Sequence, residues 1–172
     1  MNINKFTQKS LQAVQNCERI AMDYGNQEIA QEHLLYALLT QDDSLIAKLM
    51  EKMGLDKNLI INRVEEAIQK RPKVQGGQQY VGQDLNNALV HGEDEAKAMG
   101  DEYVSVEHLF LAMMKYASKD MKALFREVPD IKPDKEHLMI VSPDEGAMHR
   151  AVYFSNVLGV DMGMFYKRRD YS

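Results

Sequence analysis

Two glutamate–histidine pairs are the residues whose types and spacing most readily suggest chemistry. Glu32-His33 and Glu107-His108 each place a carboxylate beside an imidazole, and both side chains are common zinc ligands. Adjacent residues on a helix point about 100° apart, however, and no signal in the sequence brings the two imidazoles together. Ser105 is a good N-cap for a helix from Val106 to Met114, and Glu107 would lie in its first turn. We therefore predict that each pair marks the start of a helix and that no metal is bound.

Structural roles also explain the other residues with reactive side chains. Cys17 is the only cysteine, so it has no internal disulfide partner, and its apolar neighbours predict a buried thiol. A group of acidic residues lacks the spacing of a closed ligand set and predicts a solvated helix face: Asp84, Glu93, Asp94 and Glu95. Gly76-Gly77 does not continue into the lysine and hydroxyl residue of a Walker loop. We expect neither an enzyme nor a bound cofactor.

The composition favours proteins as partners. A net charge of -5 argues against a general affinity for nucleic acid or anionic lipid, because both need a basic surface. No stretch approaches the roughly 20 apolar residues of a membrane span. The start of the chain, Met1 to Lys9, is polar where a signal peptide has its apolar core. The lone cysteine fits a reducing compartment, so we predict a cytoplasmic protein without nucleic acid or membrane partners.

Helices must position these residues, because apolar residues recur at the spacing of one helical face. The first such stripe is Phe6, Ser10, Ala13, Val14, Cys17, Ala21 and Tyr24. Gly25 should end this helix in the left-handed conformation, and Leu34–Leu39 is apolar nearly all round, which predicts a helix at the core. Asp43 or Ser44 can cap a third helix and Asp56 a fourth. Their stripes are Leu45, Ile46, Leu49, Met50 and Met53, then Leu59, Ile60, Val64, Ala67 and Ile68.

The segment 71–80 changes composition to proline, glycine and glutamine, which favours a mobile connector with no element of its own. Helices resume at Leu85, and Gly92 inside the next helix suggests either close helix approach or simple drift. Most of the 12 methionines lie on helical stripes and are predicted to fill the core. Three of them are candidates for an adaptable binding surface: Met1, Met22 and Met53.

An internal repeat organises these helices. The segment Glu32–Leu39 returns 75 residues later as Glu107–Met114, with four identities and apolar residues at the other four positions. Gly25 and Gly100 stand at the same offset. We predict two four-helix copies, about 1–70 and 81–128, that pack against each other about a pseudo-twofold axis because each leaves one apolar face for its sibling.

These motifs together resemble a known family. The opening Asn4–Thr7, the run Tyr24–Gln27, both Glu-His-Leu helices and the run Asp101–Leu109 resemble the amino-terminal double Clp repeat of the ClpB disaggregase family. The resemblance covers residues 1 to about 128. The related ClpC and ClpA domains are the nearest alternatives.

The resemblance implies a function and a set of residues. In that family the module lies ahead of two ATPase rings and helps to engage unfolded or aggregated protein, or adaptor proteins. A hexamer is implied only where the ATPase domains are present. Thr7, Asp101 and Glu107 match family positions implicated in substrate handling, and Thr7 and Asp101 would lie near each other if the repeats pack as expected.

The pattern changes after Val128. Pro129 and Pro133 deny the second copy an uninterrupted fourth helix, which would leave Leu124 and Phe125 partly bare unless a short substitute covers them. Residues 129–172 then predict a strand around Leu138–Val141, a helix over Ala147–Leu158 and a strand over Val160–Tyr166. Such a parallel strand–helix–strand crossover cannot cover its own faces and is not an independent domain.

This tail resembles an internal piece of ribose-phosphate pyrophosphokinase. The resemblance implies that Asp144 lies near nucleotide and metal and that Lys167 and Arg169 stabilise a pyrophosphoryl group. The piece lacks the family's pyrophosphate and ribose 5-phosphate loops, so catalysis does not follow, and the basic run at the end of the chain is equally well explained as solvated. We interpret the tail as a fragment fused to an unrelated module.

The predicted fold is therefore all-α, with two pseudo-symmetric four-helix Clp repeats and a short C-terminal β-α-β fragment. The leading functional hypothesis is a docking module that binds apolar segments in a groove between helices of the two repeats. A mobile gating cap of a Clp ATPase ring and a partial pyrophosphokinase fusion are the alternatives.

Overall fold

The protein is mostly helical, as the spacing of its apolar residues predicts. The computed structural model describes residues 3–52, 54–74, 76–127, 139–143, 146–158 and 161–165. The first copy comprises the 3-10 helix η1 (Ile3–Lys5) and the helices α1 (Gln8–Asp23), α2 (Gln31–Thr40), α3 (Leu45–Lys52) and α4 (Lys57–Lys70). The described helices of the second copy are α5 (Gln83–Ala98), α6 (Val106–Lys115) and α7 (Lys119–Glu127). None of the helices in the described ranges has the length and apolar character needed to cross a membrane.

The predicted helix ends are confirmed by hydrogen bonds and backbone angles. Ser44, one of the two predicted caps of α3, accepts from the amide of Ala47 at 3.0 Å. Asp56 caps α4, where its Oδ1 accepts from the amide of Asn58 at 2.9 Å. Gly25 has a φ of 72°, the left-handed conformation that ends α1.

The two histidines of the repeat have the same role at the starts of α2 and α6. Nδ1 of His33 accepts the amide hydrogen of Ala30 at 2.9 Å, and Nδ1 of His108 accepts that of Ser105 at the same distance. Both imidazoles are fully buried. Burial lowers the pKa of His33 to about 4, so this ring is neutral near pH 7. The prediction that these residues mark helix starts is confirmed.

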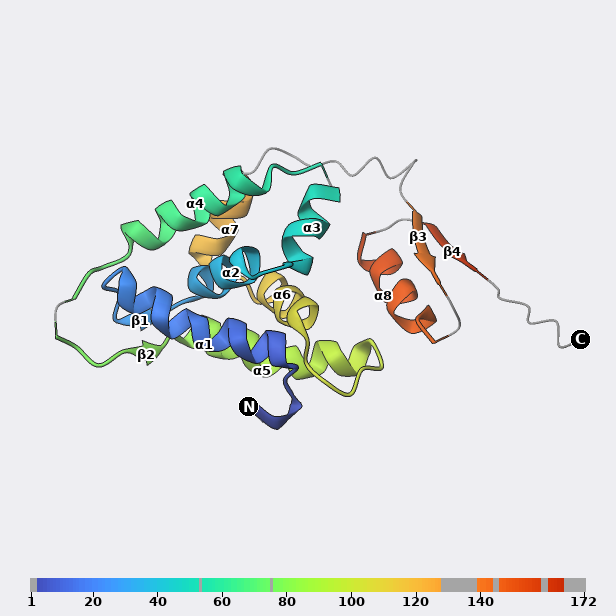
Figure 1. Cartoon of the computed structure of the whole chain (residues 1–172), viewed down its shortest axis with the longest axis horizontal. Helices are drawn as coiled ribbons and strands as arrows, with labels where there is room; N and C mark the ends of the chain where they lie inside the picture. The colour runs from blue at the N-terminus through green and yellow to red at the C-terminus, as the bar shows by residue number, and fades with distance from the viewer. Residues whose placement is uncertain are drawn as a thin grey trace, which may run out of the picture. The chain divides into compact units, whose positions relative to one another are not determined.

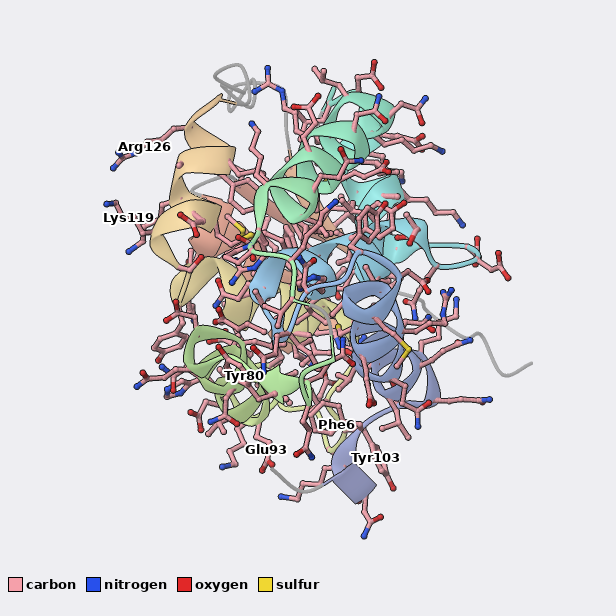
Figure 2. All side chains as sticks on the ribbon, turned by 90° about the vertical axis from the view of Figure 1, so that its left-hand side faces the viewer. Phe6, Tyr80, Glu93, Tyr103, Lys119 and Arg126 are labelled. Atoms are coloured by element: carbon pink, nitrogen blue, oxygen red, sulfur yellow. The ribbon has the colours of Figure 1, made fainter. Side chains whose placement is uncertain are left out.

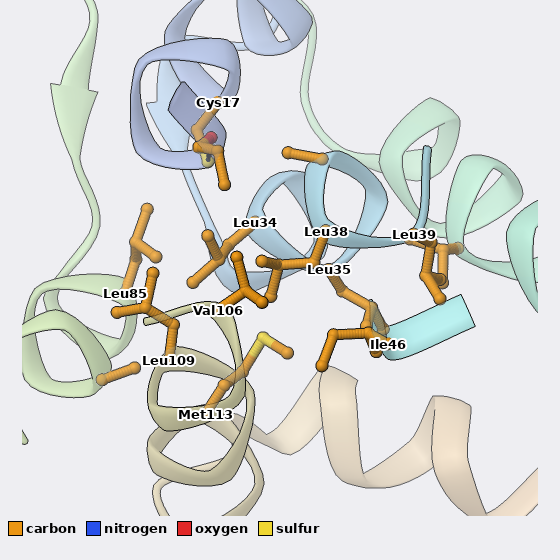
Figure 3. Close-up of a cluster of buried hydrophobic side chains, with 14 of the residues drawn as sticks. Cys17, Leu34, Leu35, Leu38, Leu39, Ile46, Leu85, Val106, Leu109 and Met113 are labelled. Carbon is orange, nitrogen blue, oxygen red and sulfur yellow. Dashed lines mark hydrogen bonds between the residues drawn. The ribbon is translucent and has the colours of Figure 1, made fainter. Parts of the chain in front are cut away.

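The hydrophobic core is shared by the two copies, with α2 at its centre. Figure 1 shows α2 among α1, α3, α4 and α6, all of which it contacts. Leu34, Leu35 and Leu38 of α2 pack with Leu109 and Met113 of α6, and all five are almost completely buried (Figure 3). Charged residues such as Lys119 and Arg126 of α7 point outward (Figure 2). Because one core spans both copies, neither copy is complete alone.

The single-residue predictions about the core have mixed outcomes. Cys17 is buried as predicted, and burial raises the pKa of its thiol to about 12. Buried methionines fill the core at Met50, Met99, Met113 and Met121, whereas Met22 is 65% exposed. Met1 and Met53 lie outside the described residues.

A Cβ on Gly92 would stand 3.1 Å from Leu109 Cδ2, so close approach explains this glycine. Glu95 was predicted to be solvated, but it is buried and paired with Lys115 at 2.8 Å.

Short parallel pairings join the two copies. Strand β1 (Glu28–Ile29) pairs in parallel with β2 (Tyr80–Val81), and Phe6 forms a parallel bridge with Val104. Gln31 adds a third link, because its side-chain amide bonds to backbone atoms of Asp84, Tyr116 and Ser118. These contacts fix the first copy against the second.

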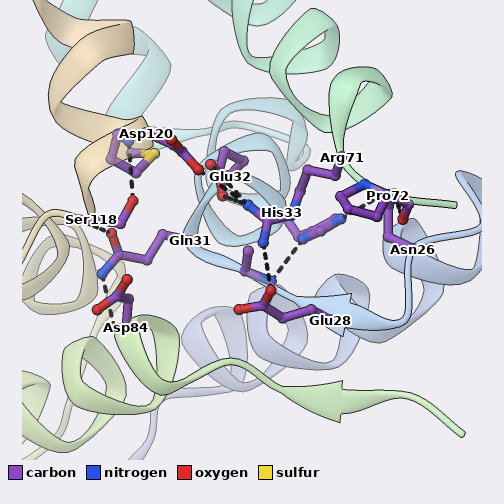
Figure 4. Close-up of polar contacts among 12 residues, drawn as sticks. Asn26, Glu28, Gln31, Glu32, His33, Arg71, Pro72, Asp84, Ser118 and Asp120 are labelled. Atoms are coloured by element: carbon purple, nitrogen blue, oxygen red, sulfur yellow. Dashed lines mark hydrogen bonds and ion pairs between the residues drawn. The ribbon is translucent and has the colours of Figure 1, made fainter.

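The connector 71–80 differs from its prediction. It was expected to carry no element, yet β2 begins at Tyr80, and the amide of Val74 donates to the carbonyl of Gly25 at 3.0 Å. Arg71 is held by the carboxylates of Glu28 and Glu32 at 2.9 and 3.2 Å (Figure 4). Partners from the first copy therefore hold both ends of this segment, which composition alone does not reveal.

Residues after 138 form a parallel strand–helix–strand crossover, as predicted. Strand β3 (Met139–Ser142), helix α8 (Met148–Leu158) and strand β4 (Asp161–Met164) follow in order, with β3 and β4 paired in parallel. The chain divides into two compact units, one of Met1–Ala96 with Glu102–Ile131 and one of Lys97–Asp101 with Lys132–Ser172.

The second copy was predicted to lack an uninterrupted fourth helix, because of two prolines near its end. Val128, Pro129 and Pro133 lie outside the described residues. Leu124 is only 7% exposed and Phe125 is partly buried against the core. Leu124 is therefore covered, and the segment predicted to supply a substitute for the missing helix also lies outside the described residues.

Candidate docking groove at the start of helix α6

A hollow of about 460 Å³ lies where the starts of three helices meet. Residues of both copies line it: Thr7, Gln8, Lys9, Asp43, Leu45, Lys48, Ser105, Val106 and Glu107. The first three belong to the start of α1, the next three to the α2–α3 turn and α3, and the last three to the start of α6. We call this hollow the α6 groove.

Hydrogen bonds within the first copy and between the two copies build the walls of the α6 groove. The amide of Thr7 donates to the carbonyl of Val104 at 2.9 Å, which places the start of α1 beside the start of α6. The Thr7 hydroxyl also caps α1 by accepting from the amide of Ser10 at 3.3 Å. Gln41 Nε2 donates to the carbonyl of Lys9 at 2.9 Å, so the α2–α3 turn is tied to the same wall.

The groove combines an apolar surface with charged rims. Leu45 is 50% exposed and Val106 is buried, and both belong to the lining. Lys48 donates a hydrogen bond to Asp43, and Lys9 lies 3.9 Å from the same carboxylate. The hydrogen bond from Lys48 and the charges of both lysines hold the pKa of Asp43 below its usual range.

The lining of the α6 groove carries apolar, hydroxyl and charged side chains. The lining holds no cysteine and no histidine. Ser105 belongs to the lining, but no histidine lines the groove with it. Within the described ranges, no group of three or more His, Cys, Asp or Glu side chains is placed to hold a metal ion. Leu45 lines the same hollow as Lys9, Lys48 and Glu107, and interfaces between proteins combine apolar and charged groups in this way.

The structure brings together two of the three residues predicted for substrate binding. Thr7 and Glu107 line the α6 groove together. Asp101 is not in its lining; it belongs to the second unit, where Arg150 donates to its carboxylate at 2.6 Å. The residues predicted to bind phosphate, Asp144, Lys167 and Arg169, lie outside the described residues.

Sequence reasoning missed the residues that α3 contributes. Leu45 was assigned to the apolar stripe of α3 and therefore to the core. The adjacent Ile46 is 1% exposed, and neighbouring residues on a helix point about 100° apart. The sequence alone did not show which of Leu45 and Ile46 lies in the core, because the adjacent Leu34 and Leu35 of the central helix α2 are both buried.

Comparison with known proteins gives a family match over most of the chain. The model of the Clp repeat (R) N-terminal domain matches residues 5–128. The ClpB chaperone of Nitratidesulfovibrio vulgaris is 40% identical over 133 residues, which cover 74% of this chain and 15% of that protein. The chain thus spans about 15% of the length of this relative.

Solved structures share the fold at low sequence identity. The Hsp104 N-terminal domain from Candida albicans has a TM-score of 0.64 at 17% identity, covering 72% of this chain and 81% of its own. A complex of the ClpV N-domain with a VipB peptide has a TM-score of 0.61 at 17% identity, covering 92% and 90%. The comparisons do not support the resemblance of residues 129–172 to ribose-phosphate pyrophosphokinase.

Proposed function

Because the chain belongs to the Clp repeat (R) N-terminal domain family, we propose that it docks unfolded protein segments or adaptor proteins for a ClpB-type disaggregase. The docking role is carried by residues 5–128 and involves no catalysis and no cofactor. ATP-driven disaggregation and hexamer formation belong to the longer protein in which such a module is joined to ATPase domains. The module works in the cytoplasm.

The exposed Leu45 in a groove built from both copies is the observation that carries this proposal. A half-exposed leucine loses water contact when an apolar side chain covers it, and this transfer favours binding. Thr7 and Glu107 line the same groove and supply hydrogen-bonding groups to the backbone of a docked segment. A structural neighbour, the ClpV N-domain, was solved with a peptide, which supports peptide docking by this fold.

We expect the docking to be weak, because the groove is shallow and offers few apolar contacts. One leucine on a shallow groove gives few buried anchors, and hot spots at tight interfaces are buried aromatic or arginine side chains. We expect a binding free energy of about -5 to -8 kcal/mol, which corresponds to millimolar to micromolar dissociation constants. Weak capture allows a client to be passed onward.

An NMR titration tests the proposal. Reduced and carboxymethylated lactalbumin, a permanently unfolded protein, is added to the isotope-labelled chain up to millimolar concentration. We expect chemical-shift changes at Leu45, Val106 and Glu107 and none at Leu59, which lies on α4 outside the groove. A spectrum without changes at any concentration would instead favour a gating cap that has no affinity of its own.

A further inference from the structure

The turn between α2 and α3 carries an unusual backbone conformation where it lines the α6 groove. Asp43 has a φ of 56°, and within the described ranges it is the one residue other than glycine with a positive φ. This left-handed region disfavours residues with a Cβ, although aspartate and asparagine tolerate it better than most. Residues in such sparsely populated conformations cluster at ligand-binding sites. The backbone of Asp43 therefore directs attention to what its side chain does in the groove.

The carboxylate of Asp43 connects two helices. Lys48 of α3 donates a hydrogen bond to its Oδ1, and Nζ of Lys9 on α1 lies 3.9 Å from its Oδ2. In the part of the chain that the structure describes, no other carboxylate pairs with either lysine. The side chains of Lys9 and Lys48 are 58% and 57% exposed. One carboxylate thus compensates two positive charges that a docked segment can reach.

Asp43 also balances the charge of the whole lining. Two lysines, Lys9 and Lys48, and two acids, Asp43 and Glu107, belong to it, so its formal charge is zero. Two lysines with Glu107 alone would leave the lining positive. A positive groove attracts acidic segments through long-range electrostatic forces, whereas a neutral one leaves the choice of segment to apolar contacts such as that with Leu45.

We propose that Asp43 makes the α6 groove selective for apolar segments without acidic side chains. This inference rests on the proposed docking function, in which Leu45 supplies the attraction and Asp43 removes a preference for negative charge. Discrimination between partners often depends on a group that acts against the wrong one. Uncharged apolar segments come from the interiors of folded proteins, whereas acidic segments lie in water in folded and disordered chains alike. The groove thus distinguishes an exposed core segment from an acidic surface segment.

Exchange of a carboxylate for an amide in the full chain tests the proposal. Asp43→Asn removes the charge and keeps a residue that tolerates the left-handed conformation. Asp42→Asn is the matched control, because Asp42 precedes Asp43 in the same turn, is exposed and lies outside the lining. Both variants remove one negative charge from the chain. The probes are two labelled peptides of equal length with the same leucines, one uncharged and one with glutamates between the leucines, and fluorescence anisotropy measures their dissociation constants.

We expect Asp43→Asn to bind the acidic peptide about threefold more tightly than the native chain does at low ionic strength, an effect of the size that one exposed charge pair produces. Its affinity for the uncharged peptide should stay the same. The gain should disappear at about 1 M salt, where the Debye length is about 3 Å. Addition of Lys48→Gln to Asp43→Asn should restore the native preference, because it removes the lysine charge that has lost its partner.

An equal gain in Asp42→Asn would overturn the proposal, because the effect would then come from the net charge of the chain. An unchanged affinity of Asp43→Asn for the acidic peptide would also overturn it, as would a gain that Lys48→Gln does not reverse. Failure of the docking function itself appears differently, as a native chain that does not bind the uncharged peptide, and it would overturn this inference as well.

Discussion

Val104 of the second copy pairs in parallel with Phe6 of the first, and its carbonyl accepts from the amide of Thr7 at 2.9 Å. A shift of 75 residues maps Phe6 to Val81 and maps Ile29 to Val104. Val81 pairs in parallel with Ile29, whose carbonyl accepts from the amide of Gly82, also at 2.9 Å. Each copy thus supplies a parallel backbone pairing to the other, which is the reciprocal contact expected of a pseudo-twofold pair.

The burial of Phe6 in the shared core predicts a large loss of stability for Phe6→Ala. Phe6 is 8% exposed and packs into the shared core, and phenylalanine to alanine substitutions in cores cost about 3 to 5 kcal/mol. Urea unfolding measures the change. Tyr103→Ala is the control, because Tyr103 is 50% exposed and surface substitutions change stability by about 0.5 kcal/mol or less. Equal effects of the two changes would contradict the packing of Phe6 in the shared core.

Gln31 predicts a second stability test. Its Nε2 donates to the carbonyls of Asp84 and Tyr116 at 2.9 and 2.8 Å, and its Oε1 accepts from the amide of Ser118 at 2.9 Å. Gln31→Met keeps the volume but removes partners from backbone groups of the second copy, at about 1 to 3 kcal/mol for each buried group left unsatisfied. Gln69→Met, on the exposed face of α4, should change the free energy of unfolding by less than about 0.5 kcal/mol. A native-like stability of Gln31→Met would show that this link does not hold the copies together.

The buried His33 predicts a loss of stability in weak acid. Its pKa is lowered to about 4 in the folded chain, whereas an unfolded histidine has a pKa of about 6.5. Below pH 6.5 the unfolded chain therefore binds the proton first, and the free energy of unfolding falls by about 3 kcal/mol between pH 6.5 and 4 from this residue alone.

His33→Gln should reduce that pH dependence, whatever its effect on stability at neutral pH. Urea unfolding at intervals from pH 7 to pH 4 supplies the curves. His91→Gln controls for the loss of a histidine near the surface of α5. An unchanged slope in His33→Gln would mean that the imidazole is protonated in the folded chain as easily as in the unfolded one.

Local signals predicted the helices, and distant partners explain what they missed. A cap, a periodic stripe and an exact offset of the repeat were enough to place His33 and His108 at helix starts. The burial of Glu95 depends on Lys115, which lies 20 residues away, and the docked connector depends on Arg71 meeting Glu28 and Glu32, about 40 residues earlier. A window as short as one helix does not contain both members of such a pair. The groove was expected between the copies, but the exposure of Leu45 follows from the packing of its neighbour Ile46.

The affinity of two leucine variants for an unfolded protein tests the docking account most directly. Leu45 in the α6 groove is 50% exposed, and Leu59 on α4 is 41% exposed but outside the groove. Each is replaced by serine, and fluorescence anisotropy measures the dissociation constant of labelled, carboxymethylated lactalbumin. The account predicts that Leu45→Ser weakens binding about tenfold, as for the loss of roughly 1.4 kcal/mol of apolar contact, while Leu59→Ser leaves it unchanged. Equal affinities of the two variants, or a larger loss in Leu59→Ser, would contradict the assignment of the α6 groove as the docking site.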